Sequence, residues 1–362
     1  MSENRRILHC DMDSFFAAVH MRDEPQLRDV PLVIGGDPDG RGVVSTANYP
    51  ARRYGIHSAM PAAHARRLCP HAVFLRPDIE RYRHESHRIM AIFRRFTDRV
   101  EPASLDEAYL EVTNSLGPYA SATALAEAIR ARVREETALT VSIGVSSSRL
   151  VAKIASDWRK PDGLTVIPPH RVLEFLAPLP VRRLHGVGPA TERALAGLGI
   201  ETIADLRARD EEDLVEVVGE LGRTLHAFAR GIDPRPVGTA HRRKSIGVED
   251  TFASDISDLA AMDQRLQAMA DQVFARLQGY GLSARTITVK ARFTDFRTLT
   301  RSQTLARPLA DADELTAWAS QLLRRTEAGN RPVRLLGVAV SGLEEATGQQ
   351  LSLFPGHGPA EA

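Results

Sequence analysis

The chain has 362 residues, of which 43% are hydrophobic and 26% charged. This is an ordinary globular composition, and the length predicts two or three domains of roughly 150 residues each. The only cysteines are Cys10 and Cys69, which excludes a disulfide scaffold and a CxxC zinc site. The first residues lack the apolar stretch of a secretory signal, and no apolar run reaches the roughly 18 residues of a membrane span. We therefore expect a cytoplasmic protein without a membrane segment.

The net charge is only +1, from 47 basic and 46 acidic residues, so a polyanionic partner must be inferred from local patches. Only four of the basic residues are lysines, namely Lys153, Lys160, Lys244 and Lys290. Each of these lysines is therefore a candidate for a specific role.

The first 167 residues alternate between strand and helix patterns. We expect strands at 6–11, 31–34, 42–46, 108–112, 141–145 and 164–167. Apolar residues at helical spacing predict helices at 79–97, around 125–133 and at 150–158, the last with Leu150, Ile154 and Trp158 on its apolar face. Strands separated by helices of this length predict an α/β sheet with helices packed on it.

Prolines at 168, 169, 178 and 180 then interrupt the pattern, and residues 170–232 look all-helical. Residues 231–238 read as a linker, because two prolines and flanking glycines resist regular structure. Residues 243–343 form a second α/β region, with a helix around 259–277 and an alternating strand at 286–294. The polar segment that follows is expected to be disordered.

Two pairs of acids lie at the ends of expected strands: Asp11 and Asp13 in one, Asp106 and Glu107 in the other. Such acids among apolar neighbours are costly unless they are paired or bind a cation. Oxygen ligands without His or Cys favour Mg²⁺ or Mn²⁺, and two such ions suit in-line displacement at phosphorus. Asp106 and Glu107 would point to opposite faces of a regular strand, so both reach one site only if the strand has not fully begun there. Capping and turn acids are the alternative interpretation.

Tyr49 and Arg52 follow the strand at 42–46, and Pro50 suits the first turn of a helix. Three residues apart, they share one helix face and form a reasonable clamp for phosphate oxygens. Lys160, in a tight turn, offers a compact charge to a phosphate. Lys153 is expected on a solvated helix face. Because no GxxxxGK[ST] motif occurs, the chain is not a P-loop enzyme.

Residues 184–190 predict a helix-hairpin-helix in which Gly188 caps and Pro189 begins the second helix. Gly186 and Gly188 would let the backbone approach a phosphate, and free N–H groups at the helix start would bind it without reading sequence. An ordinary helix turn is the alternative.

Basic residues are also frequent in the segment 285–301, which contains five of them and only one acid, Asp295. Lys290 and Arg292 share the polar face of the strand at 286–294. Such a face would hold DNA phosphates in a salt-sensitive, sequence-independent way, unless it is simply a solvated sheet face. In the polar tail, Gln350, Leu351, Leu353 and Phe354 form a short apolar peptide of the kind that docks on partners.

With these motifs the chain resembles the Y-family translesion DNA polymerases, of the bacterial DNA polymerase IV type, from about residue 6 to 343. The resemblance implies the α/β fold class in a right-hand polymerase architecture. Its parts would be an α+β palm with a ferredoxin-like sheet (1–21 and 76–167), small fingers (22–75), an all-helical thumb with the helix-hairpin-helix (168–232), a linker (233–242), a C-terminal α/β little finger (243–343) and a disordered tail (344–362).

The resemblance also implies residue roles. Asp11, Asp106, Glu107 and the carbonyl of Met12 would hold two Mg²⁺ ions, or Mn²⁺, while Asp13 would lie beside them without being a direct ligand. Phe16 would be a steric gate that rejects ribonucleotides; Phe15 would adjoin the nucleotide with its ring in the core. The triphosphate and its surroundings would be contacted by Thr46, Tyr49, Arg52 and Lys160.

For DNA, the resemblance implies contacts from Gly186 and Gly188 in the thumb, from Arg242, Arg243 and Lys244 in a tether near the template, and from Lys290, Arg292 and Arg297 in the little finger. Residues Gln350, Leu351, Leu353 and Phe354 resemble the sliding-clamp-binding peptide of bacterial polymerases.

The expected function is template-directed addition of dNTPs to a primer 3′-OH, with low fidelity and lesion bypass, by a monomer that binds primer-template DNA, dNTP and the sliding clamp. No second acidic cluster of exonuclease type occurs, so we expect no 3′–5′ proofreading. Two alternatives stay open. A non-catalytic DNA-binding adaptor recruited by the clamp would leave the acids without a purpose, and a palm-type nucleotide cyclase would leave the DNA-binding features without one.

Overall fold

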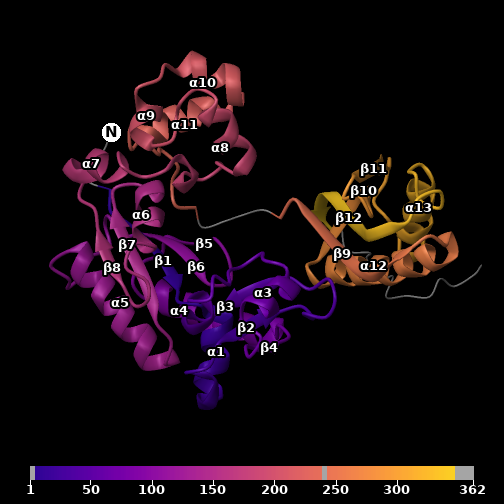
Figure 1. Cartoon of the computed structure of the whole chain (residues 1–362), viewed down its shortest axis with the longest axis horizontal. Coiled ribbons are helices and arrows are strands. Elements are labelled where there is room, and N and C mark those ends of the chain that lie inside the picture. Colours follow the sequence, from indigo (N-terminus) through magenta and orange to yellow (C-terminus); the bar gives the residue numbers. More distant parts are fainter. Residues whose placement is uncertain (1–4, 239–242, 347–362) are drawn as a thin grey trace, which may run out of the picture. The chain divides into compact units, whose positions relative to one another are not determined.

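The computed structural model describes residues 5–238 and 243–346, and the chain divides into two compact units between residues 241 and 242 (Figure 1). Arg242 and the tail peptide with Gln350, Leu351, Leu353 and Phe354 lie outside the described residues. None of the helices in the described ranges is both long and apolar enough to cross a membrane.

The first unit is built on a five-stranded sheet in the order β5-β6-β1-β7-β8. Its strands are β5 (Val100–Pro102), β6 (Glu107–Glu111), β1 (Ile7–Met12), β7 (Val141–Ser146) and β8 (Leu164–Val166). The central strand β1 is antiparallel to both neighbours, and β8 joins β7 in parallel. Four of the five strands lie within or adjoin the ranges expected from the sequence, whereas the short edge strand β5 was not expected.

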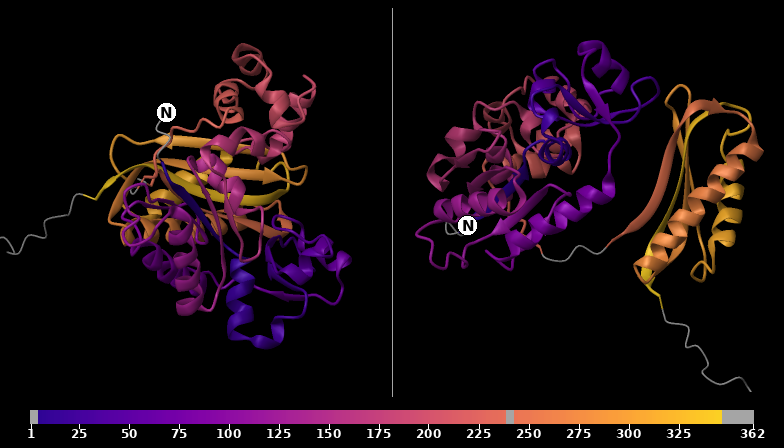
Figure 2. Two further views of the ribbon diagram at one scale, coloured as in Figure 1. Left: turned by 90° about the vertical axis from the view of Figure 1, so that its left-hand side faces the viewer. Right: turned by 90° about the horizontal axis from the view of Figure 1, so that it is seen from below.

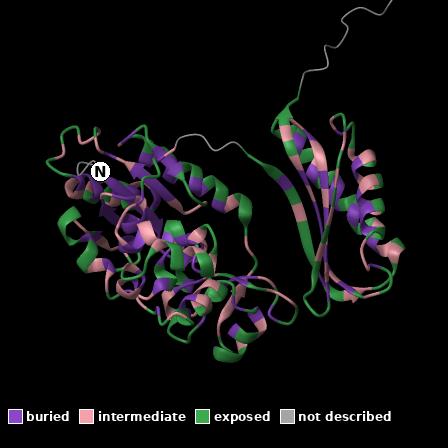
Figure 3. Cartoon of the chain, turned by 90° about the horizontal axis from the view of Figure 1, so that it is seen from above, coloured by how far each residue is buried: buried purple, intermediate pink, exposed green. Residues whose placement is uncertain are grey.

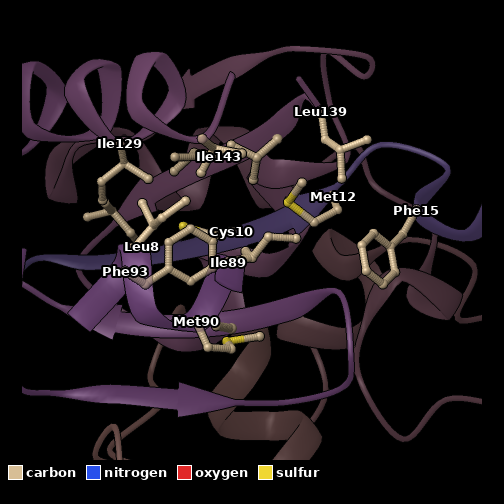
Figure 4. Close-up of a cluster of buried hydrophobic side chains, with 14 of the residues drawn as sticks. Leu8, Cys10, Met12, Phe15, Ile89, Met90, Phe93, Ile129, Leu139 and Ile143 are labelled. Atoms are coloured by element: carbon tan, nitrogen blue, oxygen red, sulfur yellow. The ribbon is translucent and has the colours of Figure 1, made fainter. Parts of the chain in front are cut away.

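The two faces of this sheet differ because successive strand residues alternate sides. Leu8, Cys10 and Met12 point into a large apolar core beneath α4 (Ile79–Arg94) and α5 (Ala122–Thr137) (Figure 4). His9 and Asp11 point to the opposite face, which is covered by α6 (Arg149–Ser156). The functional face therefore lies under α6.

A glycine sets how closely α6 approaches the sheet. A β-carbon on Gly144 of β7 would collide with the backbone of Ala152 and Ser156 in α6. Helix and strand thus touch backbone to backbone, which only glycine allows here. Shorter than expected, α6 ends at Ser156, and Trp158 is 53% exposed rather than on the helix's apolar face.

A smaller three-stranded sheet, in the order β3-β2-β4, adjoins this core. Its elements are β2 (Leu32–Gly35), β3 (Val44–Ala47), α2 (Tyr49–Arg52), α3 (Ala62–Leu68) and β4 (Val73–Leu75), and α1 (Phe15–Asp23) leads into it from β1. Asn48 begins α2 by accepting a hydrogen bond from the Ala51 amide, and Pro50 lies in the first turn as expected.

The rest of the first unit is helical, as the sequence predicts. It contains α7 (Val172–Leu176), α8 (Pro189–Ala196), α9 (Ile203–Arg207), α10 (Glu211–Val218) and α11 (Leu221–Ala229). Gly188 is the N-cap of α8 and Pro189 its first residue, which confirms the predicted start of the second hairpin helix. Gly186 has φ +95°, a conformation that residues with a β-carbon rarely adopt.

The second unit is an antiparallel sheet in the order β11-β10-β12-β9, with both helices on one face (Figure 2). Its elements are β9 (Ser245–Ile256), α12 (Leu259–Gly279), β10 (Leu282–Phe293), β11 (Thr298–Thr304), α13 (Ala312–Arg324) and β12 (Val333–Glu345). The odd residues from Ile287 to Phe293 are buried against the helices, so the predicted alternation of this strand is confirmed (Figure 3).

Candidate active site

Strand pairing brings the predicted acids to one end of the sheet. Asp11 of β1 lies directly opposite Glu107 of β6, so their side chains share a face. Asp106 precedes β6, in a bend, and its carbonyl accepts a hydrogen bond from the Met12 amide at 3.0 Å. The strand therefore begins after Asp106, and the geometric objection raised by the sequence does not apply. Ser104 fixes the bend by donating from its hydroxyl to Asp106 Oδ1 at 2.6 Å.

The three carboxylates have different electrostatic environments. Burial raises the pKa of Asp11 to about 7, although Lys160 opposes this effect. Burial also raises the pKa of Asp106. The neighbouring His9 ring and Lys153 ammonium instead hold the pKa of Glu107 below its ordinary value, against the effect of burial. Buried acids of this kind favour a cation close to them.

Two of the four lysines provide positive charge at the site. Lys160 forms an ion pair with Asp11. Lys153 Nζ lies 2.7 Å from Glu107 Oε2, so Lys153 does not occupy the solvated helix face that we expected. The ion pair with Glu107 raises the pKa of Lys153 even though burial acts to lower it.

His9 lies behind the carboxylates on the same face of β1. It is fully buried, its Nδ1 is 2.8 Å from Ser156 Oγ of α6, and its Nε2 is 3.6 Å from Glu107 Oε2. Burial lowers the pKa of His9. We did not single out His9 from the sequence, although its position two residues before Asp11 already places it on the Asp11 face.

Asp13 is a structural anchor beside the site. Its buried carboxylate accepts hydrogen bonds from the hydroxyls of Thr140 and Ser142, both at 2.8 Å, and from the Asp162 amide at 2.7 Å. The Tyr49 hydroxyl donates a fourth at 3.3 Å. These bonds use the lone pairs of Asp13 within the protein.

Tyr49 and Arg52 share one face of α2, as their spacing predicts. The Arg52 guanidinium lies 5.1 Å from the centre of the Tyr49 ring, and Arg52 Nε donates to the Ala47 carbonyl at 2.9 Å. Thr46 is half-buried on the preceding strand β3. The hydrogen bond from Tyr49 to Asp13 connects this face to the end of β1, next to Asp11.

Phe15 and Phe16 have different surroundings. Phe15 is 1% exposed and packs in the core, so only its backbone can face a nucleotide. The Phe16 ring stacks on Tyr82 of α4, with centroids 4.0 Å apart and planes 8° from parallel. The Tyr82 hydroxyl is in turn 2.9 Å from His20 Nε2.

The donor set fits hard divalent cations. Carboxylate oxygens and a backbone carbonyl are the ligands that Mg²⁺ and Mn²⁺ prefer. Within the described residues, no three His, Cys, Asp or Glu side chains already stand in a metal-binding arrangement. Ammonium groups of Lys153 and Lys160 neutralise the carboxylates instead. Burial of Asp11 and Asp106 beside these lysines indicates that the site is built to hold positive charge.

The predicted DNA-binding residues fall in both units. Gly186 and Gly188 lie in the hairpin before α8. In the second unit, Lys290 pairs with Glu249 at 2.8 Å, and Arg297 pairs with Glu327 at 3.0 Å. Arg292 donates to Thr298. The fold thus brings Glu249 and Glu327, which lie outside the segment 285–301, next to basic side chains of that segment.

The tether residues that the structure describes are exposed. Lys244 is exposed just before β9, and the Arg243 guanidinium lies over the Tyr280 ring at 4.3 Å. This aromatic contact holds the Arg243 side chain against the second unit.

Three known family models match the chain. The impB/mucB/samB family matches residues 10–157, its C-terminal domain matches residues 243–353, and the HHH motif of the IMS family matches residues 169–200. The last of these matches covers the hairpin before α8. The matched segments include the carboxylates Asp11, Asp106 and Glu107, whereas His9 and Lys160 lie outside them.

Relatives and solved structures agree with these matches. A DNA polymerase IV from Alkalilimnicola ehrlichii is 52% identical over 353 residues, covering 97% of this chain and 99% of the relative. One from Halorhodospira halophila is 52% identical over 346 residues, covering 96% and 97%. A solved chimera of the Y-family DNA polymerases Dbh and Dpo4 has a TM-score of 0.86 at 30% identity and covers 93% of this chain and 98% of its own. The chain therefore belongs to the Y-family translesion DNA polymerases of the DNA polymerase IV type, with their right-hand architecture, and is a DNA-directed DNA polymerase.

Proposed function

We propose that this polymerase transfers a deoxynucleotidyl group from dNTP to a primer 3′-OH with two divalent ions held by Asp11, Asp106, Glu107 and the Met12 carbonyl. When bound, such ions lower the pKa of the attacking hydroxyl and stabilise charge on the phosphate and the leaving pyrophosphate. The observation that carries the proposal is the convergence of the carboxylates at the adjoining ends of β1 and β6. Burial of Asp11 and the pairing of Asp11 and Glu107 with lysines support the proposal, because positive charge stabilises buried carboxylates.

Residues around these carboxylates would bind and orient the dNTP. Tyr49 and Arg52 present a phenol and a guanidinium on one face of α2, and Lys160 is the third phosphate-binding group. Since Lys160 pairs with Asp11 in this structure, binding of a triphosphate would draw its ammonium away from that carboxylate. Thr46 and the backbone at Phe15 would complete the pocket, and the flat face of Phe16 would exclude a 2′-hydroxyl.

DNA would be held through its phosphates. The hairpin at Gly186 and Gly188 offers backbone N–H groups at the start of α8. The outer face of the second sheet carries Lys290 and Arg292 beside a groove of about 390 Å³ lined partly by Gly247 and Gly337. Arg242, Arg243, Lys244 and Arg297 would add phosphate contacts, and the peptide with Gln350, Leu351, Leu353 and Phe354 would bind the sliding clamp.

We also propose that the enzyme lacks 3′–5′ proofreading, because the sequence contains no second acidic cluster of exonuclease type. Purified protein should extend a mismatched primer end or stall on it, without excising the terminal nucleotide. Release of free mononucleotides from a mismatched primer in the absence of dNTP would contradict this.

A primer-extension assay tests the two-metal proposal. Asp11→Asn, Asp106→Asn and Glu107→Gln keep the shape of each side chain but remove its charge, so each should reduce kcat by at least about a hundredfold with Mg²⁺. Asp39→Asn is the matched control, since that exposed carboxylate pairs with Arg66 of α3. Unchanged extension by Asp106→Asn or Glu107→Gln would exclude the mechanism.

A further inference from the structure

Lys153 is a cation at the site whose role the proposed function does not explain. Its Nζ donates to Glu107 Oε2 at 2.7 Å, and the two side chains are 36% and 26% exposed. A charged hydrogen bond between partly buried groups is stronger than one on the open surface. Lys153 therefore restrains one particular carboxylate, which is one of the predicted metal ligands.

Within the described residues, this is also the only hydrogen bond that the Glu107 side chain receives. The next polar group, His9 Nε2, lies 3.6 Å from the same oxygen and is buried without a hydrogen-bond partner. That distance is too long for a hydrogen bond. Lys153 thus supplies the one hydrogen bond, within the described residues, that orients the Glu107 carboxylate, while the His9 ring acts on it from 3.6 Å.

Helix α6 fixes the position from which Lys153 reaches the carboxylate. Its closeness to the sheet is set by Gly144, where no β-carbon can be accommodated. Its first turn is held by Arg149, which donates to both oxygens of Glu101 at 2.7 Å, and by the Leu150 amide, which donates to Asp233 at 3.0 Å. A helix anchored at these points cannot shift without breaking buried hydrogen bonds.

We propose that Lys153 is a positioning residue that holds the Glu107 carboxylate toward the site until a divalent cation displaces its ammonium. This inference rests on the proposed two-metal function. The displaced ammonium has room to move, because Lys153 and Glu107 both line a cavity of about 400 Å³ between the sheet and the hairpin region. Since Arg182 and Arg183 also line it, this cavity is suited to phosphate once the ammonium turns into it.

Two opposite effects follow from replacing Lys153. Removing the ammonium removes a competitor and a like charge, so free protein should bind Mn²⁺ more tightly. Losing the restraint on Glu107 should slow the chemical step. The KM for dNTP should stay unchanged, because Tyr49, Arg52 and Lys160 are untouched. A residue needed only for folding would not tighten metal binding while slowing catalysis.

The test measures Mn²⁺ binding to the full chain by electron paramagnetic resonance, without DNA or dNTP, for wild type, Lys153→Met and Lys153→Gln. Both variants should bind Mn²⁺ about twofold to fivefold more tightly, the range for loss of one partly exposed ion-pair competitor. Both variants should also lower kcat in primer extension. Lys153→Arg, which keeps the positive charge, should have a Mn²⁺ affinity and a kcat close to those of wild type. Arg132→Met, which removes a guanidinium 3.1 Å from Glu135 on α5, is the control and should change neither.

The outcomes separate this inference from the proposed function. Unchanged or weaker Mn²⁺ binding in Lys153→Met and Lys153→Gln would overturn the role of Lys153. Failure of both variants to fold, with Lys153→Arg folded, would do the same, because it would show a structural need for the charge. Wild-type Mn²⁺ binding that survives in Asp11→Asn and in Glu107→Gln would instead count against the two-metal site itself.

Discussion

Neighbouring residues of one motif have opposite surroundings at the end of β1. Phe15 belongs to the core, whereas Phe16 is half-buried and stacks flat on Tyr82. Tyr82 cannot move easily, because its hydroxyl is hydrogen-bonded to His20. Stacked rings of this kind form a rigid apolar surface, which is what exclusion of a single hydroxyl group requires.

Replacing Phe16 with Ala should therefore weaken selection against ribonucleotides. We expect the ratio of kcat/KM for dNTP over rNTP to fall by roughly tenfold to a few hundredfold, since the discrimination is steric. Single-nucleotide incorporation opposite one template base measures it. Tyr54→Ala, which removes another partly exposed ring near the small sheet, should leave the ratio as it is. A constant ratio in Phe16→Ala would refute the gate role.

Helix α6 is the element on which most of the site depends. From one helix and the turn after it come Lys153 for Glu107, Ser156 for His9 and Lys160 for Asp11. Gly144 beneath the helix sets its depth. A change at this glycine should therefore affect stability and catalysis together.

Gly144→Ala should lower the free energy of unfolding by about 1–3 kcal/mol, because the new methyl group has no space between strand and helix. It should also reduce kcat, since α6 would have to move outward with Lys153. Urea unfolding followed by Trp158 fluorescence, in a Trp318→Phe background, reports this unit. Gly40→Ala, where the added carbon makes only ordinary contacts, should be near neutral. Equal stability of Gly144→Ala and wild type would contradict the close contact.

The ion pairs of the site could not have been read from the sequence. Strand patterns identified β1, β6 and β7, and the acids at the ends of β1 and β6 were recognisable. The contact between Lys153 and Glu107 depends on how deeply α6 packs, which local pattern does not encode. For the same reason the helix was expected to continue through Trp158, whereas the chain leaves it after Ser156 and turns back so that Lys160 reaches Asp11.

At the scale of the whole molecule, the segment after α11 that contains Asp233 and Arg235 returns to the five-stranded sheet and α6. Asp233 is buried and accepts from the Leu150 amide at the start of α6, and Arg235 pairs with it at 2.7 Å. Burial opposes ionisation of Asp233, but Arg235 and the backbone donors outweigh it and hold its pKa below the ordinary value. The ionised form is thus favoured in the folded chain.

Because its folded pKa is depressed, Asp233 stabilises the fold above the pKa of the unfolded chain and loses that effect as pH falls through the folded pKa. Asp233→Asn should cost about 1–3 kcal/mol at pH 7, and the difference from wild type should shrink below about pH 4. Urea unfolding followed by Trp158 fluorescence measures the difference from wild type at neutral and at acid pH. Glu174→Gln, at an exposed pair with Arg171, should show no comparable loss. A difference that grows toward acid pH would contradict this assignment.

The apolar core of the second unit closes entirely within residues 246–343, and every other core cluster ends by residue 237. Each unit, as far as its residues are described, thus has an apolar core of its own. Exchange of one part between relatives would therefore leave each apolar core intact, so the two parts can diverge in sequence independently of each other.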